Sequence, residues 1–206
     1  MRRMLIALVA AVPFVFGTAL AQERPDAARF EIGAFPVGGV FFSESSSAVE
    51  PAFGNFALGA TLTYNVNRWI AFEGEVGNAI GIRQDLTWQD RTVTDTLSPC
   101  LYAYSGGLII HPFTGNHAVV PYAAVGAGGM TLLDNEEVAS LNLGGNSTYF
   151  VVNTGGGLKW YAHSRWGLRG DYRLMVVDDK AEGPAFFADG RARFGHRVYG
   201  GLLFFF

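Results

Sequence analysis

The sequence predicts an all-β protein that folds as an eight-stranded antiparallel up-and-down transmembrane β-barrel, and three observations support this prediction. First, the 206-residue chain is 50% hydrophobic and only 16% charged, yet beyond its N-terminus it has no run of about 18 apolar residues that would form a membrane helix. Second, apolar residues alternate with small or polar residues along several long segments, as in strands with two different faces. Third, the breaks between these segments are alternately short and long, which is typical of outer-membrane barrels.

The composition excludes several other classes of protein. Aromatic residues make up 14% of the chain, which is too many for a disordered protein. The single cysteine, Cys100, excludes a disulfide framework and a multi-cysteine metal site. The net charge of -3 provides no basic surface for nucleic acid. We expect no metal or other cofactor, because His111, His117 and His196 are scattered without ligand spacing.

Residues 1–21 are predicted to be a secretory signal peptide, and residues 22–206 the barrel domain. Arg2 and Arg3 provide the positive start, an apolar segment follows, and small residues form a cleavage site that ends at Ala21. The protein is therefore expected to be exported to the bacterial outer membrane.

The polar breaks divide the chain into strands. Three short breaks recur at similar spacing, at residues 65–68, 114–117 and 163–165. Longer polar stretches separate them, at residues 43–54, 84–99, 133–146 and 178–192. Four pairs of strands are therefore joined by tight turns at a periplasmic end and by long loops at an outer end.

In chain order, the predicted strands cover residues 28–42, 56–65, 70–77, 101–113, 118–132, 150–160, 166–176 and 197–206. Alternation separates an apolar face from a small or polar face in five of them. The sixth, for example, sets Phe150 and Val152 against Asn153 and Lys159. The first, fourth and fifth strands are rich in glycine, and their facing stays open.

The charged faces of these strands are assigned to the barrel interior. A Lys or Arg that faces lipid near the midplane costs about 2–4 kcal/mol, so three of them would cost as much as a domain's whole stability. Eight strands leave an interior that side chains can fill, and buried charges need partners. We therefore expect no open pore, although a proton or ion path along the same charges is an alternative. The expected structural charge cluster in the lumen consists of Glu73, Glu75, Lys159, Arg169, Asp171 and Arg173.

Aromatic residues gather beside the short turns, where a membrane interface would lie. Amphipathic rings favour the headgroup region of a bilayer. The predicted periplasmic aromatic girdle consists of Trp69, Phe113, Trp160 and Trp166, with Tyr161 beside it. Rings near the long loops would form an outer girdle and include Phe41, Phe42, Tyr149 and Phe150.

The order of several glycine- and aromatic-rich segments carries a resemblance to a known family. These segments are Gly59 to Tyr64, Trp69 to Gly77, Pro121-Tyr122, Gly126 to Gly128, Gly155 to Lys159, Trp166 to Arg173 and Gly200 to Phe206. The chain resembles the small eight-stranded outer-membrane barrels of the OmpA, OmpX and opacity-protein type, and more closely the broad group of outer membrane protein β-barrel domains. The resemblance covers residues 28–206.

The resemblance implies a set of partners. In this family, a terminal aromatic residue on an alternating last strand is the signal read by the barrel-assembly machinery. Carried over to this chain, that signal consists of Val198, Leu202, Phe204 and Phe206. The expected surroundings are a lipid bilayer with lipopolysaccharide, and the expected state is a monomer.

The function predicted from the sequence is a structural or surface-interaction role without enzymatic activity. The long loops are the plausible recognition surface, for a host surface or a divalent cation. One alternative is a lipid A deacylase, because His163 and Ser164 are adjacent and a His–Ser pair can serve nucleophilic catalysis. Against it, the pair lies in a predicted periplasmic turn, and Arg165-Trp166 follows where the deacylase motif continues differently. A small narrow channel is the other alternative.

Overall fold

The computed structural model describes residues 29–43, 50–88, 91–112, 118–141, 143, 145–178, 185–187 and 191–206. The predicted signal peptide, residues 1–21, lies outside the described residues, and so do Phe113 and His117. Among the residues that are described, no helix is both long and apolar enough to cross a membrane.

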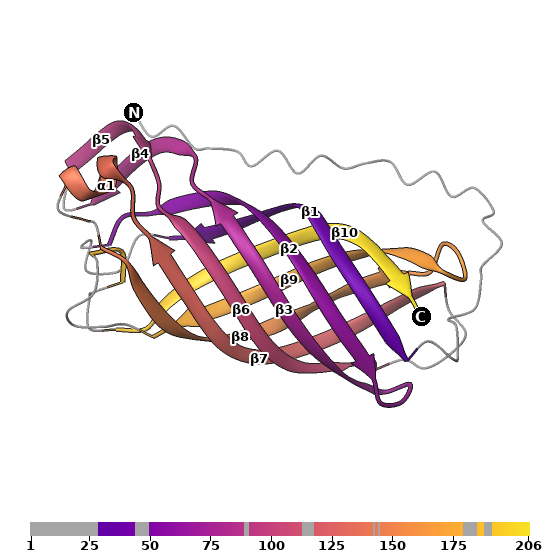
Figure 1. The fold of residues 1–206 in the computed structure, drawn as a ribbon. Helices are drawn as coiled ribbons and strands as arrows, with labels where there is room; N and C mark the ends of the chain where they lie inside the picture. Colours follow the sequence, from indigo (N-terminus) through magenta and orange to yellow (C-terminus); the bar gives the residue numbers. More distant parts are fainter. Residues whose placement is uncertain are drawn as a thin grey trace.

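Eight strands close into an antiparallel barrel in the order β1-β10-β9-β8-β7-β6-β3-β2 (Figure 1). Their bounds are β1 (Phe30–Phe42), β2 (Phe53–Asn65), β3 (Ile70–Ile80), β6 (Cys100–Ile110), β7 (Val119–Leu133), β8 (Ser147–Trp160), β9 (Trp166–Val177) and β10 (Arg193–Phe205). Every barrel strand pairs with its neighbours along the chain, and β1 closes the barrel on β10. The predicted eight-stranded barrel is thus confirmed.

The barrel strands contain 11 to 15 residues, and a tilted strand needs about 9–11 residues to cross a bilayer. The short connections lie at one end, which we call the turn end, and the long connections at the other, which we call the loop end (Figure 1). Large apolar side chains cover the outer wall, among them Leu62, Phe72, Tyr104, Leu158 and Phe204. This outer band is a lipid-facing surface.

The long connections contain more secondary structure than predicted. Residues 84–99, interpreted as a polar loop, include most of a hairpin of β4 (Arg83–Trp88) and β5 (Arg91–Leu97), which forms a separate two-stranded sheet. A short helix α1 (Glu136–Ser140) follows β7, and a 3-10 turn η1 (Ala185–Phe187) precedes β10. The hairpin escaped prediction because its sequence is mostly polar, so an alternating apolar face is barely visible.

A β-bulge in β1 explains why its facing could not be predicted. The register of β1 shifts between Ala34 and Val37 against β10, and between Phe35 and Gly39 against β2. Before the bulge, Phe35 points inward, and beyond it the inward set changes parity and includes Phe42. Pro36 lies within the bulge, a common place for a residue that cannot donate a backbone hydrogen bond.

The facing of β6 and β7 is also settled. Leu101 and Ile109 point inward from β6, and Tyr122 and Met130 point inward from β7. In each strand both faces combine glycine with large apolar residues, so the apolar content of the two faces is similar. This similarity is the reason that alternation did not distinguish them.

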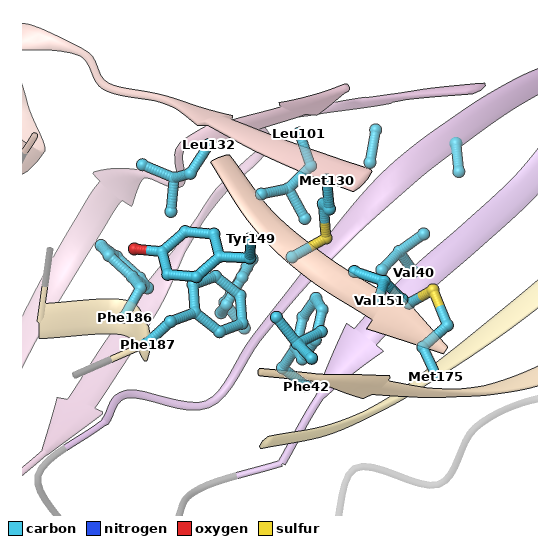
Figure 2. Close-up of a cluster of buried hydrophobic side chains, with 14 of the residues drawn as sticks. Val40, Phe42, Leu101, Met130, Leu132, Tyr149, Val151, Met175, Phe186 and Phe187 are labelled. Carbon is cyan, nitrogen blue, oxygen red and sulfur yellow. The ribbon is translucent and has the colours of Figure 1, made fainter. Parts of the chain in front are cut away.

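The barrel interior is divided into layers along its axis. A small apolar cluster at the turn end contains Val120, Tyr161, Leu203 and Phe205. Buried charges fill the middle. Toward the loop end, the interior is apolar and is lined by Phe42, Leu101, Leu132, Tyr149, Met175 and others (Figure 2). The charged residues were expected in the lumen from the sequence, but the apolar layers on either side of them were not.

One interior ring requires glycine on two nearby strands. The Tyr199 side chain of β10 reaches past β1, and its hydroxyl donates to the carbonyl of Leu58 on β2 at 3.1 Å. A Cβ atom at Gly59 would lie 2.8 Å from the Tyr199 ring, and one at Gly77 would lie 2.6 Å from its hydroxyl. Glycine at these two positions therefore makes room for the tyrosine inside the barrel.

Candidate functional site

The middle layer of the lumen is a charge cluster of eight ionisable residues. All six residues predicted for it lie in the interior and are no more than 7% exposed. The structure adds Glu31 from β1 and Arg197 from β10 to the same layer. The charge cluster is thus defined as Glu31, Glu73, Glu75, Asp171, Lys159, Arg169, Arg173 and Arg197. Its four carboxylates balance its four cations.

Arg169 donates four hydrogen bonds inside the lumen, as many as Arg173 does. Its Nη1 donates to Oε2 of Glu73, and its Nη2 donates to Oε1 of Glu73 at 3.1 Å and to Oδ2 of Asp171 at 2.7 Å. Its Nε donates to the hydroxyl of Tyr122 at 2.7 Å. A bidentate contact of this kind fixes geometry as well as charge, so Glu73 and Asp171 hold the guanidinium in one position.

Arg173 and Arg197 extend the network toward the loop end. Arg173 donates to Asp171 through Nε at 3.0 Å and to Glu73 through Nη2 at 2.8 Å. Arg197 pairs with Glu75, with Nη2 at 2.8 Å from Oε2. The Arg197 guanidinium also lies 4.7 Å from the centre of the Tyr199 ring, within the range of a cation–π contact.

A second, simpler pair lies nearer the turn end. Lys159 Nζ donates to Oε2 of Glu31 at 2.5 Å, and Asn65 donates to the other carboxylate oxygen at 3.0 Å. Both charged side chains are at most 2% exposed. Glu31 was missed because the facing of its strand was unresolved, whereas Arg197 shares the inward parity of Tyr199 and could have been included.

The charge cluster spans the barrel rather than following its wall. In the strand order, β3 and β9 are separated by four steps in either direction, so they face each other across the lumen. Glu73 on β3 is joined to Arg169 and Arg173 on β9. On the loop-end side of these pairs, the void next to Met130, Asn153 and Arg197 measures about 10 Å³, at or below the smallest space that holds one water molecule. At this level, ion pairs join opposite walls of the lumen.

The described residues of the predicted girdle, Trp69, Trp160 and Trp166, lie at the turn end with different exposures. Trp69 and Trp166 are exposed on the outside, and Trp160 is half-buried. Tyr161 instead points inward, where its ring packs 5.1 Å from that of Phe205. Phe113 lies outside the described residues.

The suggested outer girdle divides between two faces. Phe41 and Phe150 are exposed on the barrel wall, whereas Phe42 and Tyr149 are buried inside. Including all four was wrong, because successive residues of a strand point to opposite faces.

The four residues of the predicted C-terminal signal share the outer face. Val198, Leu202, Phe204 and Phe206 are 39% to 69% exposed. The backbone of Phe206 still pairs with Phe30, with N–H to carbonyl distances of 3.2 and 3.0 Å. The end of the chain therefore presents a continuous apolar edge to the membrane while it completes the β1–β10 seam.

No arrangement for metal binding or for nucleophilic catalysis is apparent among the described residues. They contain no group of three or more His, Cys, Asp or Glu side chains suited to a metal ion. His163 and Ser164 lie exposed in the turn between β8 and β9, with Ser164 Oγ 3.4 Å from His163 Nδ1. The backbone N–H of Arg165 donates to the same nitrogen at 3.3 Å. Because this nitrogen already accepts a backbone hydrogen bond, the contact does not single it out as a base for Ser164.

The other predicted polar candidates are dispersed. His111 is buried at the end of β6, and His196 lies on the outer wall, where its Nδ1 is 2.8 Å from the Tyr172 hydroxyl. Cys100 is half-buried, and its Sγ lies 3.5 Å from the N–H of Gly81.

At the loop end, the β4–β5 hairpin is fastened to α1 (Figure 1). Glu137 on α1 accepts hydrogen bonds from Arg83 Nη2 at 2.7 Å and from the N–H of Leu97 at 2.9 Å. The Leu97 N–H and the Arg83 guanidinium hold the pKa of Glu137 below its usual value. Asn135 caps α1 and donates to the carbonyl of Leu97 at 3.0 Å. These contacts hold the β4–β5 hairpin against α1.

These features together define a class of membrane protein. A closed antiparallel barrel with tight turns at one end, long loops at the other, an apolar outer wall and charges confined to its interior is a transmembrane barrel of the outer-membrane type. The chain belongs to the outer membrane protein beta-barrel domain family, whose pattern matches residues 7–193. Its location is accordingly the bacterial outer membrane, and the long loops of such barrels generally lie on the outer side.

Comparison with solved structures supports the fold. Neisserial surface protein A is 14% identical, with a TM-score of 0.62 over 87% of this chain and 98% of that one. The outer membrane protein OprG from Pseudomonas aeruginosa is 14% identical, with a TM-score of 0.51 over 89% of this chain and 98% of that one. Comparison with curated protein sequences gives no significant match.

Proposed function

We propose that this protein is a closed barrel that acts by surface interaction through its loop end, and that it is neither an open pore nor an enzyme. The observation that carries the proposal is the set of ion pairs from β3 to β9, which fill the lumen between opposite walls. With the lumen filled and the outer wall covered by lipid, the loop end is the surface that remains accessible to a partner outside the cell.

The loop end is preorganised for binding. The β4–β5 hairpin is joined to α1 through Glu137 and Asn135, and to the barrel rim through a hydrogen bond of 2.6 Å between Ser98 and Asn55. A binding surface that is already ordered loses less conformational entropy when a partner docks. The hairpin therefore supplies a rigid platform rather than a loop that must fold on contact.

The charge of the loop end favours a basic partner. Residues 43–54, 84–99, 133–146 and 178–192 contain twelve acidic side chains and three basic ones. Among them, Asp95, Glu136 and Asp178 are exposed and lie on three different connections. Complementary charge attracts partners and speeds association, and the effect falls with ionic strength. We therefore expect a basic protein or peptide to bind here.

The test uses the full chain, purified from outer membranes and reconstituted in nanodiscs. An oligolysine peptide should bind at low salt and be released as salt rises, whereas an oligoglutamate peptide should not bind. The triple variant Asp95→Asn, Glu136→Gln, Asp178→Asn should bind oligolysine severalfold more weakly. A matched control, Arg68→Gln at the turn end, should bind like the wild type. Equal binding of oligolysine by the triple variant and the wild type would contradict the proposal.

A further inference from the structure

The loop-end half of the lumen is an apolar chamber built from strand residues. Its wall is formed by the inward side chains at the loop ends of β1, β2, β6, β7, β8 and β9. One such residue from each strand, in the same order, is Phe42, Phe53, Leu101, Met130, Tyr149 and Met175. Two of them are methionines, whose flexible side chains adapt to occupants of different shape. We use the name apolar chamber for this space.

The apolar chamber is occupied by a segment that belongs to none of its walls. Phe186 and Phe187 come from η1, and both side chains are fully buried (Figure 2). The centre of the Phe187 ring lies 4.9 Å from the ring centre of Tyr149 and 5.2 Å from that of Phe42. The centre of the Phe186 ring lies 5.2 Å from that of Phe53. The two rings fill the chamber as a bound aromatic ligand would.

Arg193 fastens this segment at the chamber mouth. Its Nη1 donates to the carbonyl of Phe186 at 2.5 Å, and its Nη2 donates to the carbonyls of Ser43 at 3.0 Å and Pro51 at 2.5 Å. The guanidinium carbon lies 5.3 Å from the centre of the Phe187 ring. One side chain therefore joins the β9–β10 connection to both ends of the β1–β2 connection.

The chamber is closed below by groups that do not involve the two phenylalanines. The Arg197–Glu75 pair and the links from Glu73 to β9 lie on strands. Withdrawal of Phe186 and Phe187 would thus leave this floor in place. The result would be a blind apolar pocket that opens outward, rather than a channel through the membrane.

The geometry points to a ligand-binding site whose resident occupant is the chain's own Phe186–Phe187 pair. An external ligand enters when this pair withdraws. The matching ligand class is a small uncharged molecule with an aromatic or compact aliphatic group and a carbonyl oxygen. The apolar group takes the place of the rings, and the oxygen accepts from Arg193 as the carbonyl of Phe186 does. A neutral acceptor is favoured because Glu50 Oε2 already lies 3.6 Å from Arg193 Nε.

The probe for this proposal is 4-phenyl-2-butanone, which carries one ring and one carbonyl. The two methionines of the described strands, Met130 and Met175, both line the chamber, so their methyl NMR signals in nanodiscs report on it directly. The double variant Phe186→Ala, Phe187→Ala should bind the probe at least tenfold more tightly than the wild type. The control Phe150→Ala, on the outer wall of the same end, should behave like the wild type. Methionine signals in the double variant that do not respond to the probe would overturn the proposal.

A second measurement does not depend on the folding of that variant. In a Cys100→Ser background, Phe187→Cys should react slowly with a membrane-impermeant maleimide, and saturating probe should raise its rate at least fivefold. Phe53→Cys, on the chamber wall, should stay protected with or without probe. The added substitution Arg193→Lys should speed the labelling of Phe187→Cys without probe, because an ammonium cannot reproduce all the guanidinium contacts. A rate for Phe187→Cys that the probe leaves unchanged would show that the pair is a fixed part of the core.

Discussion

At the scale of single residues, the position of each charge is dictated by the cost of exposing it to lipid. Every acidic residue on a barrel strand, namely Glu31, Glu73, Glu75 and Asp171, points into the lumen, and each is buried. Burial of an ion is unfavourable by several kcal/mol unless partners compensate it. The charge cluster supplies these partners across the barrel, so each member depends on the others.

Neutralisation of Glu73 should destabilise the folded barrel. Glu73→Gln would leave Arg169 and Arg173 without one of their two carboxylates. Removal of one partner from a buried ion pair costs about 3–5 kcal/mol, and we expect a loss of this size in the free energy of unfolding. Urea titration of the barrel in detergent measures it.

The control for this loss is an exposed carboxylate. Asp178→Asn, at the end of β9, should change the free energy of unfolding by no more than about 0.5 kcal/mol. If Glu73→Gln were as stable as Asp178→Asn, the charge cluster would not be a structural element of the lumen.

Substitutions of Arg197 and Glu75 test whether the two buried charges stabilise each other. Arg197→Gln alone leaves the Glu75 carboxylate buried without its main partner, whereas Arg197→Gln with Glu75→Gln removes both charges. Replacement of both partners is generally less costly than loss of one. The double variant should therefore be more stable than the Arg197→Gln single variant in the same urea titration. A double variant destabilised by the sum of the two single effects would mean that the pair is not coupled.

At the scale of elements, the β4–β5 hairpin depends on one surface carboxylate. The folded-state pKa of Glu137 is lowered by the Leu97 N–H and by Arg83. A lowered pKa means that the contact stabilises the folded state above the ordinary pKa of a glutamate, and that this contribution is lost as the pH falls through the lowered value. The attachment of the hairpin to α1 through Glu137 should thus weaken in acid.

Hydrogen exchange at Leu97 measures this contact. Relative to the intrinsic rate at each pH, the protection of the Leu97 amide should fall in acid, and Glu137→Gln should lower it already at neutral pH. Glu136→Gln, on the neighbouring exposed residue, is the matched control and should leave protection unchanged. Identical protection in Glu137→Gln and the wild type would contradict the assigned role of Glu137.

The facing of some strands could be predicted from the sequence, whereas the facing of others could not. Strands with a regular two-residue period, such as β9, were predicted with their facing, because Arg169 and Arg173 alternate with Leu168 and Tyr172. In β1, a bulge changes the parity of the inward face within the strand, and no pattern of constant period can describe it. The β4–β5 hairpin was missed because it is fastened by contacts from Glu137 and Asn135, far away in the sequence.

The apolar chamber could not be predicted from the sequence either. Phe186 and Phe187 lie in a stretch that reads as a loop, and their burial depends on Arg193 and on a cavity that six strands enclose together. The alternating pattern of the strands already contained the inward apolar residues of the loop-end half of the lumen. They were not predicted to face inward because paired charges were expected throughout the lumen. The layered interior is a property of the closed barrel rather than of any single strand.

At the scale of the whole molecule, the last strand closes the barrel and carries the apolar edge that ends at Phe206. We expect Phe206→Ala to reduce the amount of folded barrel in the outer membrane severalfold, because the resemblance implies that this residue is part of the assembly signal. The fraction of heat-modifiable protein on gels of outer-membrane fractions measures assembly. Phe194→Ala, an outward residue at the other end of the same strand, is the control, and an equal effect of both substitutions would contradict a specific role for Phe206.

We propose that the ion pairs between β3 and β9 close the lumen, so that function resides at the loop end. Current recording across a planar bilayer distinguishes a closed barrel from a channel. The purified full chain should insert and give no stepwise conductance, because ion pairs join opposite walls of the lumen and apolar side chains pack on either side of them. Reproducible single-channel steps from the wild-type protein would contradict a closed lumen and would identify the barrel as a channel.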